Sequence, residues 1–356
     1  MPSKRWLSPW KNSAEKPAIY HCISRVVDRR FVFGDVEREH FRMLMRMQEN
    51  FSGCRVLSYC IMSNHFHILL EVPPIPNDGI SDEELLKRLA VIYNQAVVAE
   101  VAKELATART EKREEWVAEI HARYVYRMHD LSEFMKTLLQ RFTRWFNRTH
   151  ERSGTLWEER YKSVIVESGI AARTMAAYID LNPVRAGMVQ DPAEYRWSSY
   201  GEAVGGGTKG NGKKAREGLV RANLSHEGVG FEAERWKDVT RTYRRVMGLA
   251  LGRKNGGAEV QKGEARSPMN KAEALVGETN GTVLPDLKLV AMLRCRVRYF
   301  ADGAVIGSKA FVNETFAAAR ERFTANRKDG ARPMRGNGHG AKGVLWSVRN
   351  LRVKVE

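Results

Sequence analysis

Residues 54–72, CRVLSYCIMSNHFHILLEV, decide the fold. Two runs rich in β-branched, aromatic and other apolar residues meet at a Ser-Asn pair, residues 63–64, which favours a tight turn. In the second run His65 and His67 alternate with Phe66, so both imidazoles project from one face of the strand and the phenyl ring from the other. The stretch therefore predicts a β-hairpin with two histidines on one face.

The flanking segments alternate between strand and helix patterns. Residues Ala18–Val27 (AIYHCISRVV) predict a strand, and Asp35–Phe51 carries apolar residues at helical spacing. Residues Leu131–His150 predict a second amphipathic helix, and Tyr161–Ser168 (YKSVIVES) a short strand. Together with the hairpin they predict an α+β fold with a ferredoxin-like βαββαβ core, an antiparallel sheet with helices on one face.

Other segments lie outside this core. A charged helical stretch predicts an insertion over about residues 74–130, within a first domain of residues 1–204. Residues 205–283 open with GGGTKGNGKKAREG, and their glycine and charge predict a flexible linker with partial helix. Residues 284–356 predict a small basic accessory module in which Ser308 caps a helix.

The charge of the chain is its unusual bulk property. Lys and Arg number 59 against 42 Asp and Glu, giving +17 at pH 7 and a pI near 9.8. Such a balance draws a protein toward polyanions, and nucleic acid is the first partner to consider. The alternative is a basic composition that serves solubility alone. Hydrophobic residues at 43% argue against wholesale disorder.

The cysteines and the N-terminus point to a reducing compartment. Cys22, Cys54, Cys60 and Cys295 have no CxxC spacing, so neither a zinc knuckle nor a disulfide framework is predicted. The N-terminal residues lack an apolar signal core, and no stretch reaches the roughly 20 apolar residues that cross a bilayer. We therefore expect a cytoplasmic protein.

The histidine pair is the first candidate for chemistry. Two neutral imidazoles on one strand face, His65 and His67, can bind a single divalent ion. The alternative is a pair of half-buried histidines that bond to backbone or water. The spacing alone does not decide between the two.

A tyrosine on the helix after the last strand is the candidate nucleophile. A phenol can attack a phosphodiester and hold the product as a phosphotyrosine, but its usual pKa of about 10 means that Tyr178 needs a metal or a base. Asn182, four residues later, could add an amide oxygen to the metal shell, or could serve only as a cap before Pro183. Tyr178 could equally be a packing residue, and Tyr161 is the second choice of nucleophile.

Cations and an aromatic residue cluster before the last strand. Arg160 and Lys162 can hold phosphates while Trp157 offers a face to an unstacked base. Arg144 and Arg148, at helical spacing with Arg141, could add a basic stripe, or form an ordinary solvated helix face. These residues are the predicted DNA-binding set.

Several motifs in order carry a family resemblance. The series YHCISRVVDRRFVFGD, MSNHFHILLEVP, RFTRWFNRTHERSGTLWEERYKSVIVE, YIDLNPVRAGMV and DPAEYRWSSY, over roughly residues 17 to 200, resembles the REP-associated tyrosine transposases, relatives of the single-tyrosine HUH transposases. The resemblance implies a nuclease that uses Mg²⁺ or Mn²⁺, with His65, His67 and Asn182 as metal ligands and Tyr178 as nucleophile. It also implies bacterial, nucleoid-associated action on single-stranded, hairpin-forming repeat DNA, with a possible homodimer.

Two other functions remain open. A single-stranded nucleic-acid-binding regulator that kept the fold but lost catalysis would show the same charge. A ferredoxin-like RNA-binding module would carry surface aromatics at alternating strand positions, which HFHILLEV does not supply. The two histidines together with Tyr178 favour the enzyme.

Overall fold

The structure is a computed structural model, and it describes residues 6–11, 16–207, 209–224, 232–250, 293, 298–323, 325–334 and 345–348. Cys295, residues 251–292 and part of the predicted accessory module lie outside the described residues. None of the described helices is long and apolar enough to cross a membrane.

The core has the predicted βαββαβ order. It runs β1 (Ala18–Arg25), α1 (Asp35–Ser52), β2 (Arg55–Ile61), β3 (His65–Val72), α5 (Leu131–Thr149) and β4 (Lys162–Val166). The four strands lie in the order β2-β3-β1-β4, and each neighbouring pair is antiparallel. This is the ferredoxin-like arrangement, so the predicted fold class is confirmed.

The hairpin forms as the sequence predicts. Residues 63–64 connect β2 to β3, and the N–H of Met62 donates to the carbonyl of His65 at 2.8 Å to close the turn. The Phe66 ring lies 4.7 Å from Phe41 of α1 and 5.6 Å from Trp157, on the face that α1 and α5 cover. Because side chains alternate along a strand, His65 and His67 lie on the opposite face.

That opposite face is also covered by helices, which corrects the expectation of helices on one face. Helix α6 (Ile170–Asp180) packs on β2 and β3, and α9 (Gly210–Asn223) packs on β2 and α6. Arg221 of α9 donates to the buried carboxylate of Glu71 on β3 at 2.8 Å. Both faces of the sheet are apolar enough to need cover, since β2 and β3 are buried almost throughout.

Three short elements follow α6 at the end of the predicted first domain: α7 (Asn182–Arg185), the 3₁₀ turn Pro192–Glu194 and α8 (Ser199–Gly205). Helices also occupy much of the predicted linker, where α9 is followed by the 3₁₀ turn Ala233–Arg235 and α10 (Trp236–Ala250). Leu219 of α9 and Tyr243 of α10 are fully buried in the main core. Residues 210–224 and 232–250 are thus part of the folded body rather than a linker.

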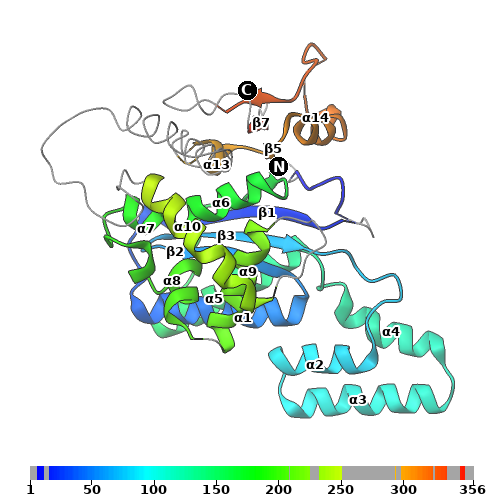
Figure 1. Ribbon diagram of the computed structural model, residues 1–356. Helices are drawn as coiled ribbons and strands as arrows, with labels where there is room; N and C mark the ends of the chain where they lie inside the picture. Colours follow the sequence, from blue (N-terminus) through cyan, green and yellow to red (C-terminus); the bar gives the residue numbers. More distant parts are fainter. Residues whose placement is uncertain are drawn as a thin grey trace, which may run out of the picture.

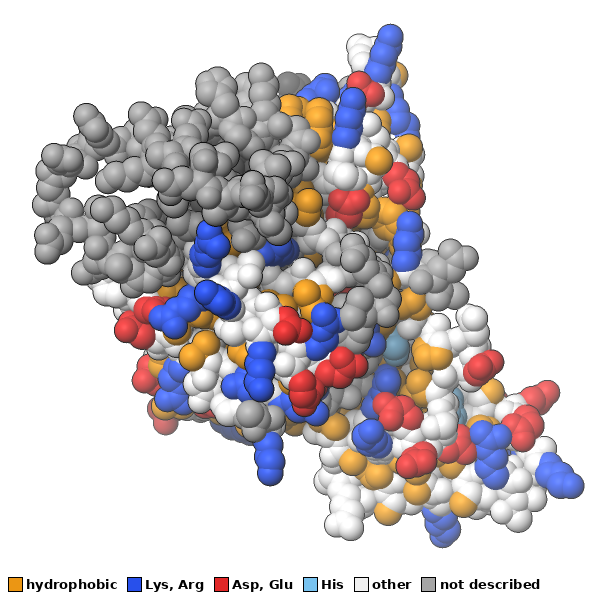
Figure 2. Space-filling model, in the orientation of Figure 1, with side chains coloured by type: hydrophobic (Ala, Val, Ile, Leu, Met, Phe, Trp, Pro, Cys, Tyr) orange, Lys and Arg blue, Asp and Glu red, His pale blue; other side chains and the backbone are white. Residues whose placement is uncertain are grey.

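The insertion is a separate helical lobe. It consists of α2 (Asp82–Ile92), α3 (Gln95–Thr110) and α4 (Glu114–Val125), which project from the body in Figure 1. Its own apolar cluster includes Leu85, Leu105 and Ile120 and joins the body through Phe51 at the end of α1. Acidic and basic side chains mix on the face of the lobe seen in Figure 2, and several pair there.

The C-terminal residues extend the core sheet. Strand β5 (Val305–Gly307) pairs in parallel with β4, followed by β7 (Trp346–Val348) and β6 (Arg332–Pro333), so that seven strands form one sheet. Helix α13 (Arg298–Asp302) lies against β4, and α14 (Lys309–Ala317), followed by the 3₁₀ turn Arg320–Arg322, packs on β5 and β7. Ser308 caps α14 as predicted, accepting the N–H of Phe311 at 3.2 Å.

Candidate functional site

The site is built on the histidine face of β1, β3 and β4. In the register of β1 and β3, Arg25 faces His65 and Ile23 faces His67, and on the other side Ile23 faces Lys162 of β4. Paired residues share a face of the sheet. The two histidines therefore lie beside an exposed arginine and close to a second cation.

A third histidine lies behind the pair. His21 of β1 is fully buried, and its Nε2 lies 3.0 Å from Nδ1 of His67. Its Nδ1 lies 2.9 Å from the carbonyl oxygen of Phe300 on α13. The ring of His21 is stacked beside that of His67 with centroids 5.2 Å apart. His21 thus connects the C-terminal part of the chain to the predicted metal ligand.

Hydrogen bonds also hold His65 in place. Its Nδ1 lies 2.8 Å from Oδ1 of Asn64, and Nδ2 of Asn64 donates to the carbonyl of Arg29 at 2.8 Å. Arg29 belongs to the 3₁₀ turn Val27–Arg29 after β1, where Asp28 and Arg29 have φ of 59° and 56°. Non-glycine residues rarely take such angles, and they concentrate at functional sites.

All three imidazoles are neutral at pH 7. Burial lowers the pKa of His21 to about 4, and burial together with the charge of Arg25 lowers the pKa of His65 to about 4. Burial and the neighbouring His65 and His21 lower the pKa of His67 well below its usual range. A neutral imidazole is the form that binds a metal ion.

The spacing of His65 and His67 fits one shared ion. Their ring centroids are 5.1 Å apart at an interplanar angle of 80°. Two imidazoles on one ion, each with a metal–nitrogen bond of about 2.1 Å, have ring centres roughly 5 Å apart. Among the described residues there is no group of three or more His, Cys, Asp or Glu side chains that could hold a metal ion.

The ring of Tyr178 lies beside these histidines. It comes from α6, and its centroid is 6.0 Å from that of His67 and 6.2 Å from that of His21. Phe300 stacks on it at 4.4 Å, and the guanidinium of Arg185 lies 5.0 Å from its centroid. Tyr178 is 2% exposed, and burial raises its pKa to about 12 although Arg185 acts in the opposite direction.

The two other candidates from the tyrosine argument lie differently. Asn182 begins α7 directly after the end of α6, and its Nδ2 donates to the carbonyls of Tyr178 and Ile179, each at 3.2 Å. The amide nitrogen of Asn182 is thus engaged at the end of its own helix. Tyr161 donates its hydroxyl to the carbonyl of Leu131 on α5 at 3.5 Å, which puts it on the face away from the histidines.

The predicted DNA-binding residues fall into separate groups. Lys162 lies on the histidine face, 3.9 Å from Asp302 of α13, and Arg160 is exposed just before it. Arg144 and Arg148 are exposed on α5, which covers the other face of the sheet. None of these three arginines forms an ion pair with another residue that the structure describes.

Trp157 is a correction to the prediction. Its ring contacts Phe33, Phe41, Phe66 and Phe142, and its indole N–H donates to the hydroxyl of Thr143 at 2.9 Å. A ring held in an aromatic cluster with its polar atom satisfied serves packing. Because Trp157 is half-buried, it leaves only part of its surface to a base.

Sequence reasoning missed residues that gather at the same end of the sheet. His21 and Arg25 were read only as strand residues, although their alternation puts them on one face of β1. Arg29, Arg30 and Phe31 lie exposed in the loop after β1, and Phe31 is 83% exposed. The sequence signal for this loop was the run Arg-Arg-Phe between a strand and a helix.

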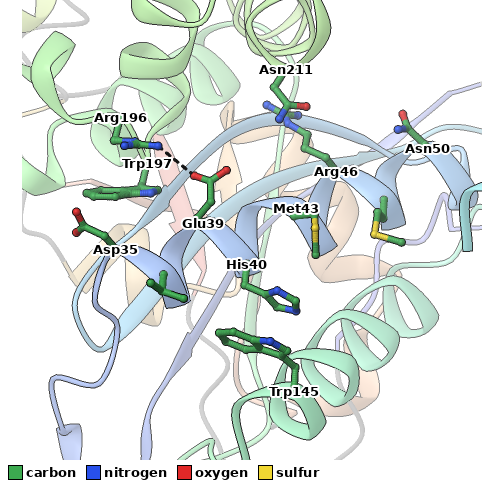
Figure 3. Close-up of a pocket in the computed structure, with 12 residues that line it drawn as sticks. Asp35, Glu39, His40, Met43, Arg46, Asn50, Trp145, Arg196, Trp197 and Asn211 are labelled. Carbon is green, nitrogen blue, oxygen red and sulfur yellow. Dashed lines mark hydrogen bonds and ion pairs between the residues drawn. The ribbon is translucent and has the colours of Figure 1, made fainter. Parts of the chain in front are cut away.

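A surface hollow of about 680 Å³ lies elsewhere, on the outer side of α1. Figure 3 shows Trp145 beneath His40, and Arg196 reaching Glu39 at 3.5 Å. The rings of His40 and Trp145 are stacked at 3.8 Å. Since α1 covers the Phe66 face, this hollow is separated from the histidines by the sheet.

Part of the chain is similar to a known protein family. Residues 15–116 match the family described as Transposase IS200 like, a match that includes His65 and His67 and ends before Tyr178. A solved structure of a REP-associated tyrosine transposase bound to a REP hairpin aligns with 59% of this chain and 88% of that chain, at 11% identity and a TM-score of 0.33. The search of curated proteins returned no match. Residues 15–116 are thus similar to the IS200-like transposases, in agreement with the resemblance carried by the motif series over roughly residues 17 to 200.

Proposed function

We propose that the protein is a metal-dependent endonuclease and strand transferase that acts on single-stranded DNA through a tyrosine. The observation that carries the proposal is the meeting of three side chains from separate segments. His65 and His67 of β3 and Tyr178 of α6 come together on one face of the sheet, with Tyr178 6.0 Å from His67 between ring centroids.

Mg²⁺ or Mn²⁺ would be held by His65 and His67, with the Asn182 oxygen as a third ligand. When bound, the ion would polarise the scissile phosphate and offset the charge that gathers on its oxygens. The neutral state of both imidazoles and their 5.1 Å separation support this assignment.

Tyr178 would be the nucleophile. Its phenolic oxygen bonds to the phosphorus as the bond to the 3′ oxygen breaks, and the phenolic proton leaves to solvent while the 3′ oxygen leaves as a hydroxyl. The protein keeps the 5′ phosphate. Rejoining is the reverse attack by another 3′ hydroxyl, so bond energy is conserved and no nucleotide is consumed. Phe300 stacks on Tyr178, so its side chain has to move aside for the attack to occur.

Basic residues around the site would hold the DNA backbone. Arg25, Lys162 and Arg160 flank the histidine face, and Arg29 and Arg30 continue the positive charge into the next loop. Phe31, the most exposed large apolar side chain among the described residues, can stack an unpaired base in place of Trp157. Hairpin-forming repeats, action at the nucleoid and a homodimer follow only from the family resemblance, and a cytoplasmic location only from the sequence features described above.

A second function is supported by one observation. Tyr178 is 2% exposed beneath Phe300, as it would be in a protein that binds single-stranded DNA without cutting it. Such a regulator would have no use for the metal-binding geometry of His65 and His67. The two functions differ in whether a covalent adduct forms.

The deciding experiment uses labelled hairpin DNA from repeats that flank the encoding gene. Purified protein is incubated with it in Mn²⁺ and, in parallel, in chelator, and covalent adduct is scored on a denaturing gel. The enzyme predicts an adduct with Mn²⁺ that is lost in chelator and in His67→Ala. Tight binding of the hairpin with no adduct under any condition would instead establish the regulator.

A further inference from the structure

We propose that two hydrogen-bond relays, each ending on a backbone carbonyl, fix His65 and His67 in the tautomer that carries its proton on Nδ1. Nε2 of both rings then holds the lone pair for the divalent ion. The inference rests on the metal-dependent function proposed above. It assigns positioning roles to His21 and Asn64, two residues that would not touch the metal or the DNA.

The relay to His67 follows from what each atom can do. The carbonyl oxygen of Phe300 can only accept, so Nδ1 of His21, 2.9 Å away, must donate. A neutral imidazole has one proton, so Nε2 of His21 is then an acceptor. Nδ1 of His67 lies 3.0 Å from that nitrogen and has to be the donor. The proton of His67 is thus on Nδ1, and its Nε2 is unprotonated.

The relay to His65 follows from the same argument, with the Asn64 amide between the imidazole and the backbone carbonyl. Nδ2 of Asn64 donates to the carbonyl of Arg29 at 2.8 Å, which fixes the orientation of the amide. Its Oδ1 then faces Nδ1 of His65 at 2.8 Å and can only accept. Nδ1 of His65 therefore carries the proton, and Nε2 is free in this ring as well.

Burial makes the tautomer of His67 costly to change. His67 is 4% exposed and His21 fully buried, so a broken bond between them would not be replaced by water. If the proton of His67 moved to Nε2, the unprotonated Nδ1 of His67 would face the unprotonated Nε2 of His21. Ligands held in one tautomer and one orientation gain affinity for a metal, and partners of this kind typically contribute 10- to 100-fold.

The first relay also gives the C-terminal part of the chain a role. Its last acceptor, the carbonyl of Phe300, comes from α13, which lies outside residues 15–116 that match the family. The proposed metal site thus depends on a segment that lies outside the matched residues. The second relay, through Asn64, is contained within the matched residues.

Substitutions that keep or break the relay provide the test. His21→Gln offers a donor and an acceptor in place of the imidazole, whereas His21→Leu offers neither. Mn²⁺ is titrated into the full chain and free ion is followed by its paramagnetic resonance signal. We expect His21→Leu to weaken Mn²⁺ binding by about 10- to 100-fold and His21→Gln to recover most of it. His40→Phe, which removes a histidine stacked on Trp145, should leave the affinity unchanged.

Nitrogen NMR of ¹⁵N-histidine-labelled protein without metal reads the tautomers directly and needs no variant. Protonated Nδ1 and unprotonated Nε2 in both His65 and His67 are expected, and a proton on Nε2 of His67 would overturn the inference even if His21→Leu did not fold. Wild-type Mn²⁺ affinity in a folded His21→Leu would overturn it too. A different result would show that His65 and His67 do not hold the metal at all. In that case His65→Ala and His67→Ala would bind Mn²⁺ as well as the wild type.

Discussion

Removing the Phe300 ring should make Tyr178 more reactive. The phenyl ring stacks on Tyr178 at 4.4 Å and is 1% exposed, so Phe300→Ala opens the nucleophile to solvent and DNA. The backbone carbonyl that accepts from His21 stays in place, so the relay to His67 is retained. The substitution thereby separates access to the tyrosine from the state of the histidines.

The magnitude follows from the pKa of Tyr178. Burial raises it from 10.0 to about 12, a difference of about 3 kcal/mol in favour of the neutral phenol. If opening the site restores the usual pKa, the phenolate fraction near neutral pH rises by up to about 100-fold. Loss of the buried ring should at the same time lower the unfolding free energy by about 3–5 kcal/mol.

The assay is the initial rate of covalent adduct formation on hairpin DNA in Mn²⁺, alongside denaturant unfolding. Phe316→Ala is the matched control, because Phe316 is also buried in the C-terminal part but contacts Phe323 instead of the tyrosine. Faster adduct formation in Phe300→Ala alone is expected. An unchanged or slower rate in a folded Phe300→Ala protein would refute the view that this ring limits access to Tyr178.

Other substitutions test the remaining parts of the account. Burial raises the pKa of Asp180 to about 7 from 3.8. Between pH 3.8 and pH 7 the folded state therefore holds a proton that the unfolded state has lost. The unfolding free energy falls as pH rises through this range, by about 3 kcal/mol from pH 5 to pH 8. Asp180→Asn should flatten this dependence in thermal unfolding, and an unchanged slope would contradict it. Arg25→Gln and Arg160→Gln should each weaken single-stranded DNA binding and reduce its salt dependence by about one counterion, unlike Arg123→Gln in the insertion. Phe31→Ala should cost about 1–3 kcal/mol of single-stranded binding and Phe31→Trp should retain it, whereas equal loss in both would argue against stacking.

The strands and helices of the core could be predicted because each depends on the spacing of side chains within its own segment. The alternation around His65 and His67 decides which face each side chain takes, and two amphipathic helices fill the gaps between the strands. The position of Tyr178 on a helix after the last core strand is equally local. Its meeting with the histidines is not, since it depends on how α6 crosses β2 and β3.

Pairing across the sheet could not be read from one strand. His21 becomes a partner of His67 only through the register of β1 and β3 and the arrival of α13 from far along the chain. The packing of Trp157 could not be predicted for a similar reason. The residues that follow it in sequence are charged, but its neighbours in space are phenyl rings from α1, β3 and α5.

Glycine content was misleading in the predicted linker. A Cβ at Gly218 would collide with the carbonyl oxygen of Val56, and one at Gly212 with the backbone of Gly206. These glycines let α9 approach the sheet and the end of α8 closely, so they serve packing rather than flexibility. Composition alone does not distinguish the two uses.

The central claim is that Tyr178 forms the covalent bond to DNA, and peptide mapping of the adduct tests it most directly. Adduct formed on hairpin DNA in Mn²⁺ is digested with protease and nuclease, and the nucleotide-bearing peptide is sequenced by mass spectrometry. The account predicts one modified tyrosine, Tyr178, and no adduct in Tyr178→Phe. A nucleotide on Tyr161, or an adduct of undiminished yield in Tyr178→Phe, would contradict it.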